Sequence, residues 1–397
     1  MAVDQIAHWA KRKGINLVAT ADWTHPLWLR ELKENLIETN DGLFTLKKGP
    51  KDIFFLLSTE IASIYTQQGR GHRIHNLVLA PSFEVVEKIN QKLTSYGVNL
   101  LSDGRPMTNL SSLELCELVF SISPDCLIIP AHVWTPWYSL YGSRSGFDSL
   151  RECFGKFTDQ ILAIETGLSS DPAMNWRVKE LDNRAILSFS DAHSLQKMGR
   201  EATIFKLEKD KKPTYLKIRE AISKGKIAST IEFYPEEGKY HYTGHRACQV
   251  KQSPKETKKL GTTCPVCGKG FTVGVMDRVQ ELADRPADFQ PKKRPPYQMM
   301  VPLTEILSES LKVGVSSQMV EKEYNRLTGQ IGSEFEVLLK AKKREIEKIS
   351  GPKVAEGIEK VREGEIFVDP GYDGVFGTVK IWGEKGKKEK QKQMALF

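Results

Sequence analysis

Short apolar runs alternate with helix-like segments over the first 235 residues of the chain. Runs with the length and composition of strands lie at residues 15–20, 53–60, 74–80, 126–132, 162–165, 185–190 and 202–207. Helices are expected between them, at residues 82–95, 111–121, 172–181 and 214–223. Because strands that alternate with helices run parallel, about seven of them predict an α/β fold with a seven-stranded, TIM-like β/α barrel. The active sites of such barrels lie where the strands end.

Acidic residues and histidines fall where these strands are expected to end. They are Asp22, His25, Glu60, His75, His132, Glu165, Asp191 and His193. Carboxylates and neutral imidazoles are the ligands of catalytic zinc, manganese or iron. A single histidine is more often structural, but several at successive strand ends favour a metal centre that activates water and neutralises phosphate charge. We assign catalytic roles to Glu60, Asp191 and His193, and expect zinc in the barrel with Mg²⁺ or Mn²⁺ for catalysis.

A second metal signature of a different kind follows. His245-x-x-Cys248 and Cys264-x-x-Cys267 have the composition and spacing of a structural zinc site with four ligands. His241 is an alternative to His245 as the first ligand. A thioredoxin-like redox pair is a poorer explanation, because no βαβ unit surrounds the cysteines. A module this small depends on its metal for folding.

The composition changes along the chain and divides it into four parts. We expect a metal-dependent barrel at 1–235, a zinc-binding module at 236–290, a mostly helical DNA-binding region at 291–383 and a flexible basic tail at 384–397. The formal net charge of +8 favours a polyanionic partner. No apolar run approaches the roughly 18 residues of a membrane span, and no signal peptide is present, so we expect a cytoplasmic, nucleoid-associated protein without membrane contact.

Aromatic and basic residues near the expected metal ligands suggest contacts with DNA. Trp134, Trp137 and Tyr138 follow His132 and would stack an extruded base if exposed, although packing against the barrel explains them equally well. Arg70, Arg73 and Arg144 are candidates for phosphate contacts, against the default of solvated surface residues.

Two further segments are consistent with a DNA-directed protein. Residues 345–358 faintly resemble a helix-hairpin-helix motif, which binds the DNA backbone, but an amphipathic helix pair is the simpler interpretation. The last residues resemble the pentapeptide that binds the bacterial sliding clamp, with Gln393 as the amide donor and acceptor, and Met394, Leu396 and Phe397 as apolar contacts.

Several fragments resemble the polymerase and histidinol phosphatase (PHP) family: TADWTHP, LSTEI, RIHNLVLAP, IIPAHVWTPW, AIETGLSSDP and FSDAHS. With the cysteine module and the tail included, nearly the whole chain resembles the endonuclease Q family of DNA-repair enzymes. The resemblance implies a seven-stranded barrel with up to three metals, with His25, Glu60, His75, His132, Asp191 and His193 among the ligands. It also implies nicking on the 5′ side of hypoxanthine, uracil, xanthine or abasic sites in double-stranded DNA.

The beginning of the chain departs from the family pattern. The PHP family starts with a strand that carries His-x-His and a further histidine, and this sequence has none of them. His8 is expected on a helix surface and does not replace them. The resemblance then implies that the centre of Glu60, His75 and His132 is kept while the other two centres lose ligands, through a misassigned start codon or a truncated enzyme.

These observations predict a metal-dependent DNA endonuclease that is tethered to the sliding clamp. Two alternatives remain open. A PHP-family phosphomonoesterase would act on small molecules and not on DNA. A protein weakened by N-terminal truncation would bind DNA and the clamp without catalysis, and would hold one zinc per chain.

Overall fold

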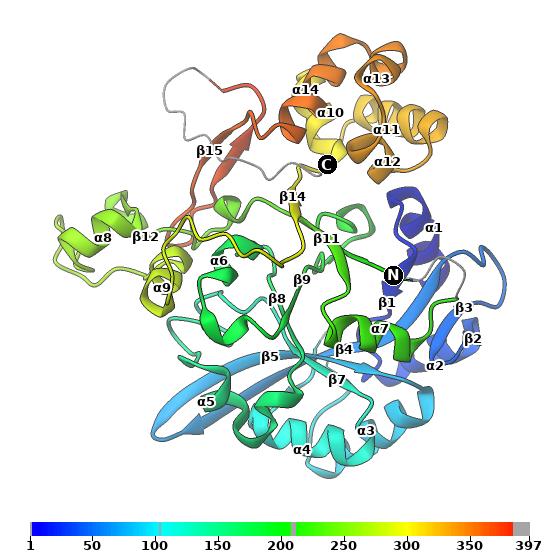
Figure 1. Cartoon of the computed structure of the whole chain (residues 1–397), viewed down its shortest axis with the longest axis vertical. Helices are drawn as coiled ribbons and strands as arrows, with labels where there is room; N and C mark the ends of the chain where they lie inside the picture. Colours follow the sequence, from blue (N-terminus) through cyan, green and yellow to red (C-terminus); the bar gives the residue numbers. More distant parts are fainter. Residues whose placement is uncertain (1, 103–104, 208–211, 384–397) are drawn as a thin grey trace.

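The structure is a computed structural model that describes residues 2–102, 105–207 and 212–383. It has a mixed α/β body followed by a zinc-type module and a helical C-terminal region (Figure 1). The largest sheet has seven strands and includes the path β2 (Leu36–Asn40), β3 (Leu43–Leu46), β4 (Phe54–Gln67), β5 (Arg70–Ala80) and β7 (Leu127–Pro130). β1 (Leu17–Ala19) and β6 (Met107–Thr108) also pair with β4, both in parallel.

The central strands of this sheet are antiparallel, which differs from the expected parallel order. β5 pairs over its whole length with residues 57–67 of β4 in an antiparallel hairpin, and β5 pairs with β7 in the same sense. The reason is the two-residue turn at Gln68 and Gly69, whose φ angles of 51° and 77° suit a tight hairpin of the kind that joins antiparallel strands. The apolar runs at 53–60 and 74–80 predicted two separate strands and did not indicate this turn.

The remaining strands form smaller sheets beside the first. β8 (Ala163–Glu165) and β9 (Ala185–Leu187) form a parallel pair. β10 (Ala202–Phe205) is antiparallel to β11 (Ile227–Glu232), which pairs in parallel with β14 (Tyr297–Met299). Within the described residues these sheets do not close, so the α/β class is found but the seven-stranded barrel is not confirmed.

The helices expected in this part of the chain are present. α3 (Phe83–Ser95), α4 (Ser112–Ile122) and α7 (Tyr215–Ser223) match the expected ranges closely. α4 begins with the capping box of Ser111 and Glu114. The segment expected at 172–181 is instead the short α6 (Pro172–Trp176) followed by a 3₁₀ turn. The other helices here are α1 (Val3–Lys13), α2 (Pro26–Asn35) and α5 (Leu150–Phe154).

The cysteine-containing segment is small and is anchored to the α/β body. It contains the hairpin β12 (Thr243–His245) and β13 (Val250–Gln252), α8 (Pro254–Leu260) and α9 (Val275–Leu282). Val275 and Val279 of α9 belong to the same hydrophobic core as the α/β body. The buried guanidinium of Arg278 donates to the carbonyls of Tyr141 (3.0 Å) and Phe147 (3.1 Å). This helix therefore completes the core of the preceding part of the chain.

The C-terminal region packs around a second hydrophobic core, which also includes Ile231 of β11 and Tyr234. Its helices are α10 (Leu303–Leu311), α11 (Gln318–Ile331), α12 (Glu334–Leu339), α13 (Lys343–Ser350) and α14 (Pro352–Arg362), followed by the antiparallel pair β15 (Phe367–Asp369) and β16 (Thr378–Lys380). A buried ion pair, with Lys13 Nζ 2.6 Å from Glu334 Oε2, joins α1 to α12. No helix among the described residues has the length and apolar character needed to cross a membrane.

Candidate metal centres and the surface beside them

Glu60, His75 and His132 form a compact group with metal-ligand chemistry. Nδ1 of His75 lies 2.7 Å from Oε1 of Glu60, and Nε2 of His132 lies 3.3 Å from the same oxygen. The two ring nitrogens are 3.1 Å apart. All three donor atoms lie within 4.8 Å of one another, so one ion fits between them. Two imidazole nitrogens and a carboxylate oxygen suit zinc, manganese or iron.

The backbone brings these residues together from three strands. Glu60 and His75 lie within β4 and β5, near one another across the hairpin, where Ala62 is opposite His75. His132 lies two residues after the end of β7. Glu60 and His75 were expected at strand ends, because the apolar runs did not indicate how far β4 and β5 extend. The structure brings together three of the six residues predicted as barrel ligands, and two of them lie within strands rather than at strand ends.

Charge and burial shift the pKa values of Glu60 and His75. Burial raises the pKa of Glu60, but hydrogen bonds from His132 and His75 outweigh it and hold the pKa below its usual range. Burial lowers the pKa of His75, which favours the neutral, metal-binding form. Nε of Arg105 lies 3.1 Å from Oε2 of Glu60. This arginine was missed in the sequence, where no pattern connects it with Glu60.

Several of the acids and histidines that the sequence assigns to the metal site have a left-handed backbone, which is unusual for residues other than glycine. The φ angles are 42° at Asp22, 31° at His132 and 42° at Asp191. Oε2 of Glu165 accepts the backbone N–H of His132 at 2.5 Å and so fixes one of these conformations. Burial raises the pKa of Glu165 to about 8. Left-handed backbone angles at residues other than glycine persist where surrounding contacts enforce them, and this is common at functional sites.

Asp191, His193 and His25 do not join a three-ligand group among the described residues. Burial lowers the pKa of His132, but the nearby carboxylates of Glu60, Glu165 and Asp191 together raise it above its usual value. Asp191 therefore lies near the first group. His193 is 73% exposed, with Nδ1 3.0 Å from the Asp191 carbonyl. His25 precedes α2, and its N–H donates to the Asp22 carbonyl. Metal-ligand roles for these three residues therefore stay predictions.

Arg200 fixes the loop that carries Asp191. Its Nε donates to the Ser190 carbonyl at 2.9 Å, and its Nη2 donates to the Asp191 carbonyl at 3.1 Å. These two bonds hold the backbone on both sides of the Ser190–Asp191 peptide. No sequence motif pointed to Arg200.

The second group consists of the four residues expected to hold structural zinc. Donor atoms of His245, Cys248, Cys264 and Cys267 all lie within 4.8 Å of one another. Burial raises the pKa of the Cys264 thiol, but backbone N–H donors of Cys267 and Val266 outweigh it and lower the pKa to about 6. A thiolate at neutral pH fits a zinc ligand. The alternative ligand, His241, lies outside this group.

The aromatic residues after His132 differ in their surroundings. Trp134 is completely buried and its Nε1 donates to Asn175 Oδ1 at 2.8 Å, so its assignment as a base-stacking residue is wrong. Tyr138 is half-buried, with its ring centre 4.7 Å from that of His75. Trp137, also half-buried, meets the ring of Tyr240 edge to face at 5.3 Å.

The three arginines predicted to contact phosphate are exposed. The guanidinium of Arg73 lies 5.5 Å from the ring centre of Tyr138, beside the first metal group. Arg70 is at the start of β5, and Arg144 donates to the Phe271 carbonyl in the cysteine-containing segment. The predicted clamp-binding residues Gln393, Met394, Leu396 and Phe397 lie outside the described residues.

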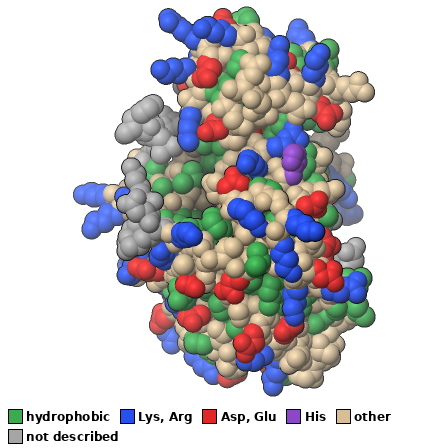
Figure 2. Space-filling model, turned by 90° about the vertical axis from the view of Figure 1, so that its right-hand side faces the viewer, with side chains coloured by type: hydrophobic (Ala, Val, Ile, Leu, Met, Phe, Trp, Pro, Cys, Tyr) green, Lys and Arg blue, Asp and Glu red, His purple; other side chains and the backbone are tan. Residues whose placement is uncertain are grey.

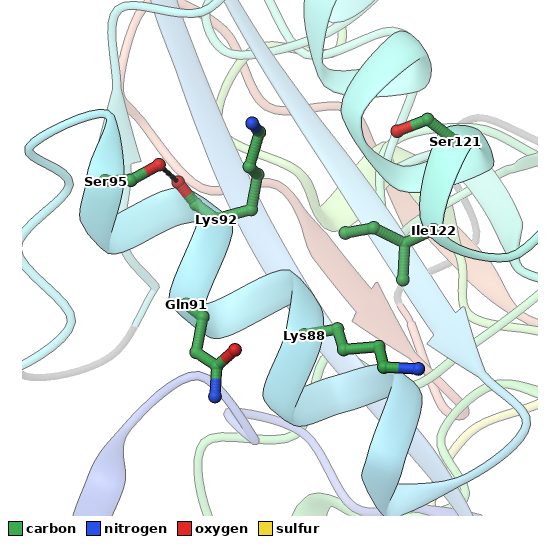
Figure 3. A pocket seen from close by; sticks show the side chains of 6 residues that line it. All are labelled: Lys88, Gln91, Lys92, Ser95, Ser121 and Ile122. Atoms are coloured by element: carbon green, nitrogen blue, oxygen red, sulfur yellow. Dashed lines mark hydrogen bonds between the residues drawn. The ribbon is translucent and has the colours of Figure 1, made fainter.

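A depression between α3 and α4 is unrelated to either ligand group. Figure 3 shows its lining residues, Lys88, Gln91, Lys92, Ser95, Ser121 and Ile122. None of them belongs to the metal groups, and the depression is open to solvent. We assign it no role.

The fold and these two groups define a mixed α/β protein with two candidate metal centres and an appended helical region. A family model described as the MJ0043 C-terminal domain matches residues 302–365. The uncharacterized protein MJ0043 of Methanocaldococcus jannaschii is 36% identical over 258 residues, which cover 64% of this chain but only 32% of that longer protein. The uncharacterized protein YqxK of Bacillus subtilis is 30% identical over 381 residues, which cover 94% of this chain and 90% of YqxK.

Two solved structures are similar over nearly the whole chain. The crystal structure of the lesion-specific endonuclease PfuEndoQ from Pyrococcus furiosus has a TM-score of 0.82 at 34% identity, covering 98% of this chain and 93% of that one. Endonuclease Q in complex with a 27-mer duplex, with an abasic lesion at the active site, has a TM-score of 0.81 at 34% identity and covers 98% and 94% of the two chains. This chain belongs to the endonuclease Q family.

Proposed function

We propose that this chain is a metal-dependent DNA endonuclease of repair that nicks duplex DNA on the 5′ side of deaminated bases or abasic sites. The observation that carries the proposal is the convergence of Glu60, His75 and His132 in a chain that matches lesion-specific endonucleases over 98% of its length. The family complex with an abasic duplex supports DNA as the substrate.

The residues of the first group suit the chemistry of this reaction. A divalent metal held by Glu60, His75 and His132 would supply activated water and neutralise charge on the phosphodiester. Arg105 holds the second oxygen of Glu60 and keeps the carboxylate oriented. Tyr138, beside His75, offers an aromatic face to an extruded base, and Arg73 places a cation over that ring for a nearby phosphate.

The later parts of the chain are proposed to hold the DNA. The zinc module and the helical region supply cations. Figure 2 shows several Lys and Arg side chains, interspersed with Asp and Glu, on the upper part of one face, where the C-terminal helices lie. The turn at Gly351 between α13 and α14 agrees with either a helix-hairpin-helix or an amphipathic helix pair. Docking to a bacterial sliding clamp through Gln393, Met394, Leu396 and Phe397 remains part of the proposal.

A nicking assay tests this function. Duplexes would carry one deoxyinosine, deoxyuridine or abasic site, with Mn²⁺ or Mg²⁺ present, and an unmodified duplex would serve as the substrate control. We expect a single nick on the 5′ side of the lesion that is absent in Glu60→Gln. The nick should be present in Glu87→Gln, which changes a half-exposed carboxylate on α3 that pairs with Lys33. Hydrolysis of a phosphomonoester without any DNA nick would overturn the proposal in favour of a phosphatase.

A further inference from the structure

Phe376 is the most exposed large hydrophobic side chain among the described residues, with 71% of its surface accessible to solvent. We infer that Phe376 enters the base stack of the DNA and opens the duplex beside the metal centre. The inference rests on the proposed function and goes beyond it, because it names the residue that separates the bases. An apolar side chain inserted between base steps unstacks them and kinks the duplex.

The turn that carries Phe376 is held rigidly. Between β15 and β16, Tyr372 and Val375 exchange backbone hydrogen bonds of 3.0 and 2.8 Å around Asp373 and Gly374, which have φ angles of 41° and 87°. The carboxylate of Asp373 accepts the backbone N–H of Arg246 at 2.7 Å.

Backbone hydrogen bonds also join both ends of this turn to residues 236 and 237, at the start of the zinc-binding module. Gly371 donates to the Glu236 carbonyl at 2.9 Å, and Gly377 donates to the Glu237 carbonyl at 3.0 Å. A Cβ at Gly377 would lie 2.0 Å from the Glu236 carbonyl oxygen, so only glycine permits this approach. A side chain on such a pinned turn loses little conformational freedom when it binds, which favours insertion.

A series of aromatic and cationic contacts leads from Phe376 to the metal ligands. Nζ of Lys239 lies 5.8 Å from the ring centre of Phe376 and 5.6 Å from that of Tyr240. Tyr240 in turn meets Trp137, which lies five residues after His132. In Figure 1 the hairpin of β15 and β16 lies between the helical region and the zinc module. The exposed phenyl ring is thus connected to the loop that carries a metal ligand.

The chemistry of this surface fits duplex DNA. Aromatic rings stack on bases of any sequence, and the ammonium group of Lys239 suits a neighbouring phosphate. Val375 beside Phe376 is 40% exposed, so the apolar part is a narrow point rather than a broad patch. A small apolar projection bordered by a cation suits insertion between base pairs better than it suits packing against another protein.

The test compares Phe376→Ala with Tyr96→Ala in the full chain. Tyr96 is a matched control, because it is also exposed and has Lys92 Nζ at 5.6 Å from its ring. Nicking would be measured on a duplex with one abasic site and on the same strand placed in an unpaired bubble. We expect Phe376→Ala to lower the nicking rate about tenfold or more on the duplex and only slightly on the bubble substrate. Phe376→Trp should restore the nicking rate on the duplex.

A binding measurement separates this inference from the proposed function. With 2-aminopurine beside the lesion and Glu60→Gln as the background to prevent nicking, binding should raise the fluorescence of the unstacked base, and Phe376→Ala should abolish that rise. If the unmodified chain nicks the lesion but Phe376→Ala behaves like Tyr96→Ala in both assays, the inference fails and the proposed function stands. If the unmodified chain neither nicks nor unstacks the duplex, both fail.

Discussion

Nδ1 of His75 and Nε2 of His132 face one another at 3.1 Å, and Oε1 of Glu60 is within hydrogen-bonding distance of both. We expect Glu60→Gln to lose the metal of this group while the four-ligand zinc site stays filled, because an amide removes the anionic ligand at almost constant shape. Nicking should fall at least about 100-fold. Metal content per chain, measured by mass spectrometry after gel filtration, checks the prediction.

The control for this change is Glu87→Gln, which neutralises a half-exposed carboxylate on α3 that pairs with Lys33. It should keep the metal content and the nicking rate of the unmodified chain. Unchanged metal content and activity in Glu60→Gln would mean that this group is not the catalytic centre.

Cys264→Ser should release one zinc per chain and unfold the segment around residues 243–272. The segment is too small for a core of its own, so its folding depends on the metal. The rest of the chain should stay folded, because α9 packs within the α/β core. Limited proteolysis with mass spectrometry should reveal new cleavage confined to this segment.

Val266→Ser is the matched control in the same turn. Val266 lies between the two cysteines and is 69% exposed, so its replacement should leave zinc content and proteolysis unchanged. Resistance of Cys264→Ser to protease would contradict a folding role for the metal.

The ion pair of Lys13 and Glu334 should contribute strongly to stability. Both side chains are buried, and Glu334 also accepts the hydroxyl hydrogen of Tyr324 at 2.8 Å. Lys13→Met leaves a buried charge unpaired and should lower the free energy of unfolding by about 3 kcal/mol or more. Adding Glu334→Gln should recover part of this loss.

Lys11→Met serves as the comparison on the same helix, because Lys11 forms an exposed ion pair with Asp52. This substitution should lower the free energy of unfolding by less than about 1 kcal/mol. Urea denaturation of the three variants and the unmodified chain measures these differences. An equal loss in the free energy of unfolding for Lys11→Met and Lys13→Met would contradict a strong contribution of the Lys13–Glu334 ion pair.

Glu232 should make the protein less stable as the pH rises. Burial raises the pKa of this carboxyl from 4.5 to about 8, against hydrogen bonds from Ser188, Thr230 and Thr166. Between these two values the folded state binds more protons than the unfolded state, so stability falls with increasing pH by up to about 1.4 kcal/mol per unit. Glu232→Gln should flatten the dependence of stability on pH in this window.

The urea midpoint measured at several pH values from 4 to 9 tests this effect. Glu363→Gln, at the exposed end of α14, should reproduce the unmodified profile. A profile for Glu232→Gln that keeps the original slope would show that this carboxyl does not cause it.

The sequence was sufficient to locate seven strands, the main helices and the residues of both ligand groups, because these depend on local patterns. It did not indicate β2, β3, β6 or β11. Ser111 and Glu114 cap α4 as their spacing indicates, and the four zinc-type ligands converge as their motif predicts. The pairing of strands was not predictable from apolar runs alone, since the turn at Gln68 and Gly69 reverses the chain.

Long-range contacts account for the other differences. Arg105 reaches Glu60 from a loop 45 residues away, and no spacing rule relates the two positions. Trp134 follows a metal ligand, as an exposed stacking residue would, but Asn175 provides a buried partner for its indole nitrogen. The contact of Arg105 with Glu60 and the burial of Trp134 can be seen only in the folded structure.

The anchoring of α9 also bears on how the protein is made. Val279 and Arg278 complete a core that begins with Val3, so about 280 residues must leave the ribosome before that core can close. Until then the apolar face that α9 will cover stays exposed on the nascent chain. The α/β body and the cysteine-containing segment are therefore one unit of synthesis. A chain that stops near residue 235 would expose an uncovered apolar surface to chaperones and proteases.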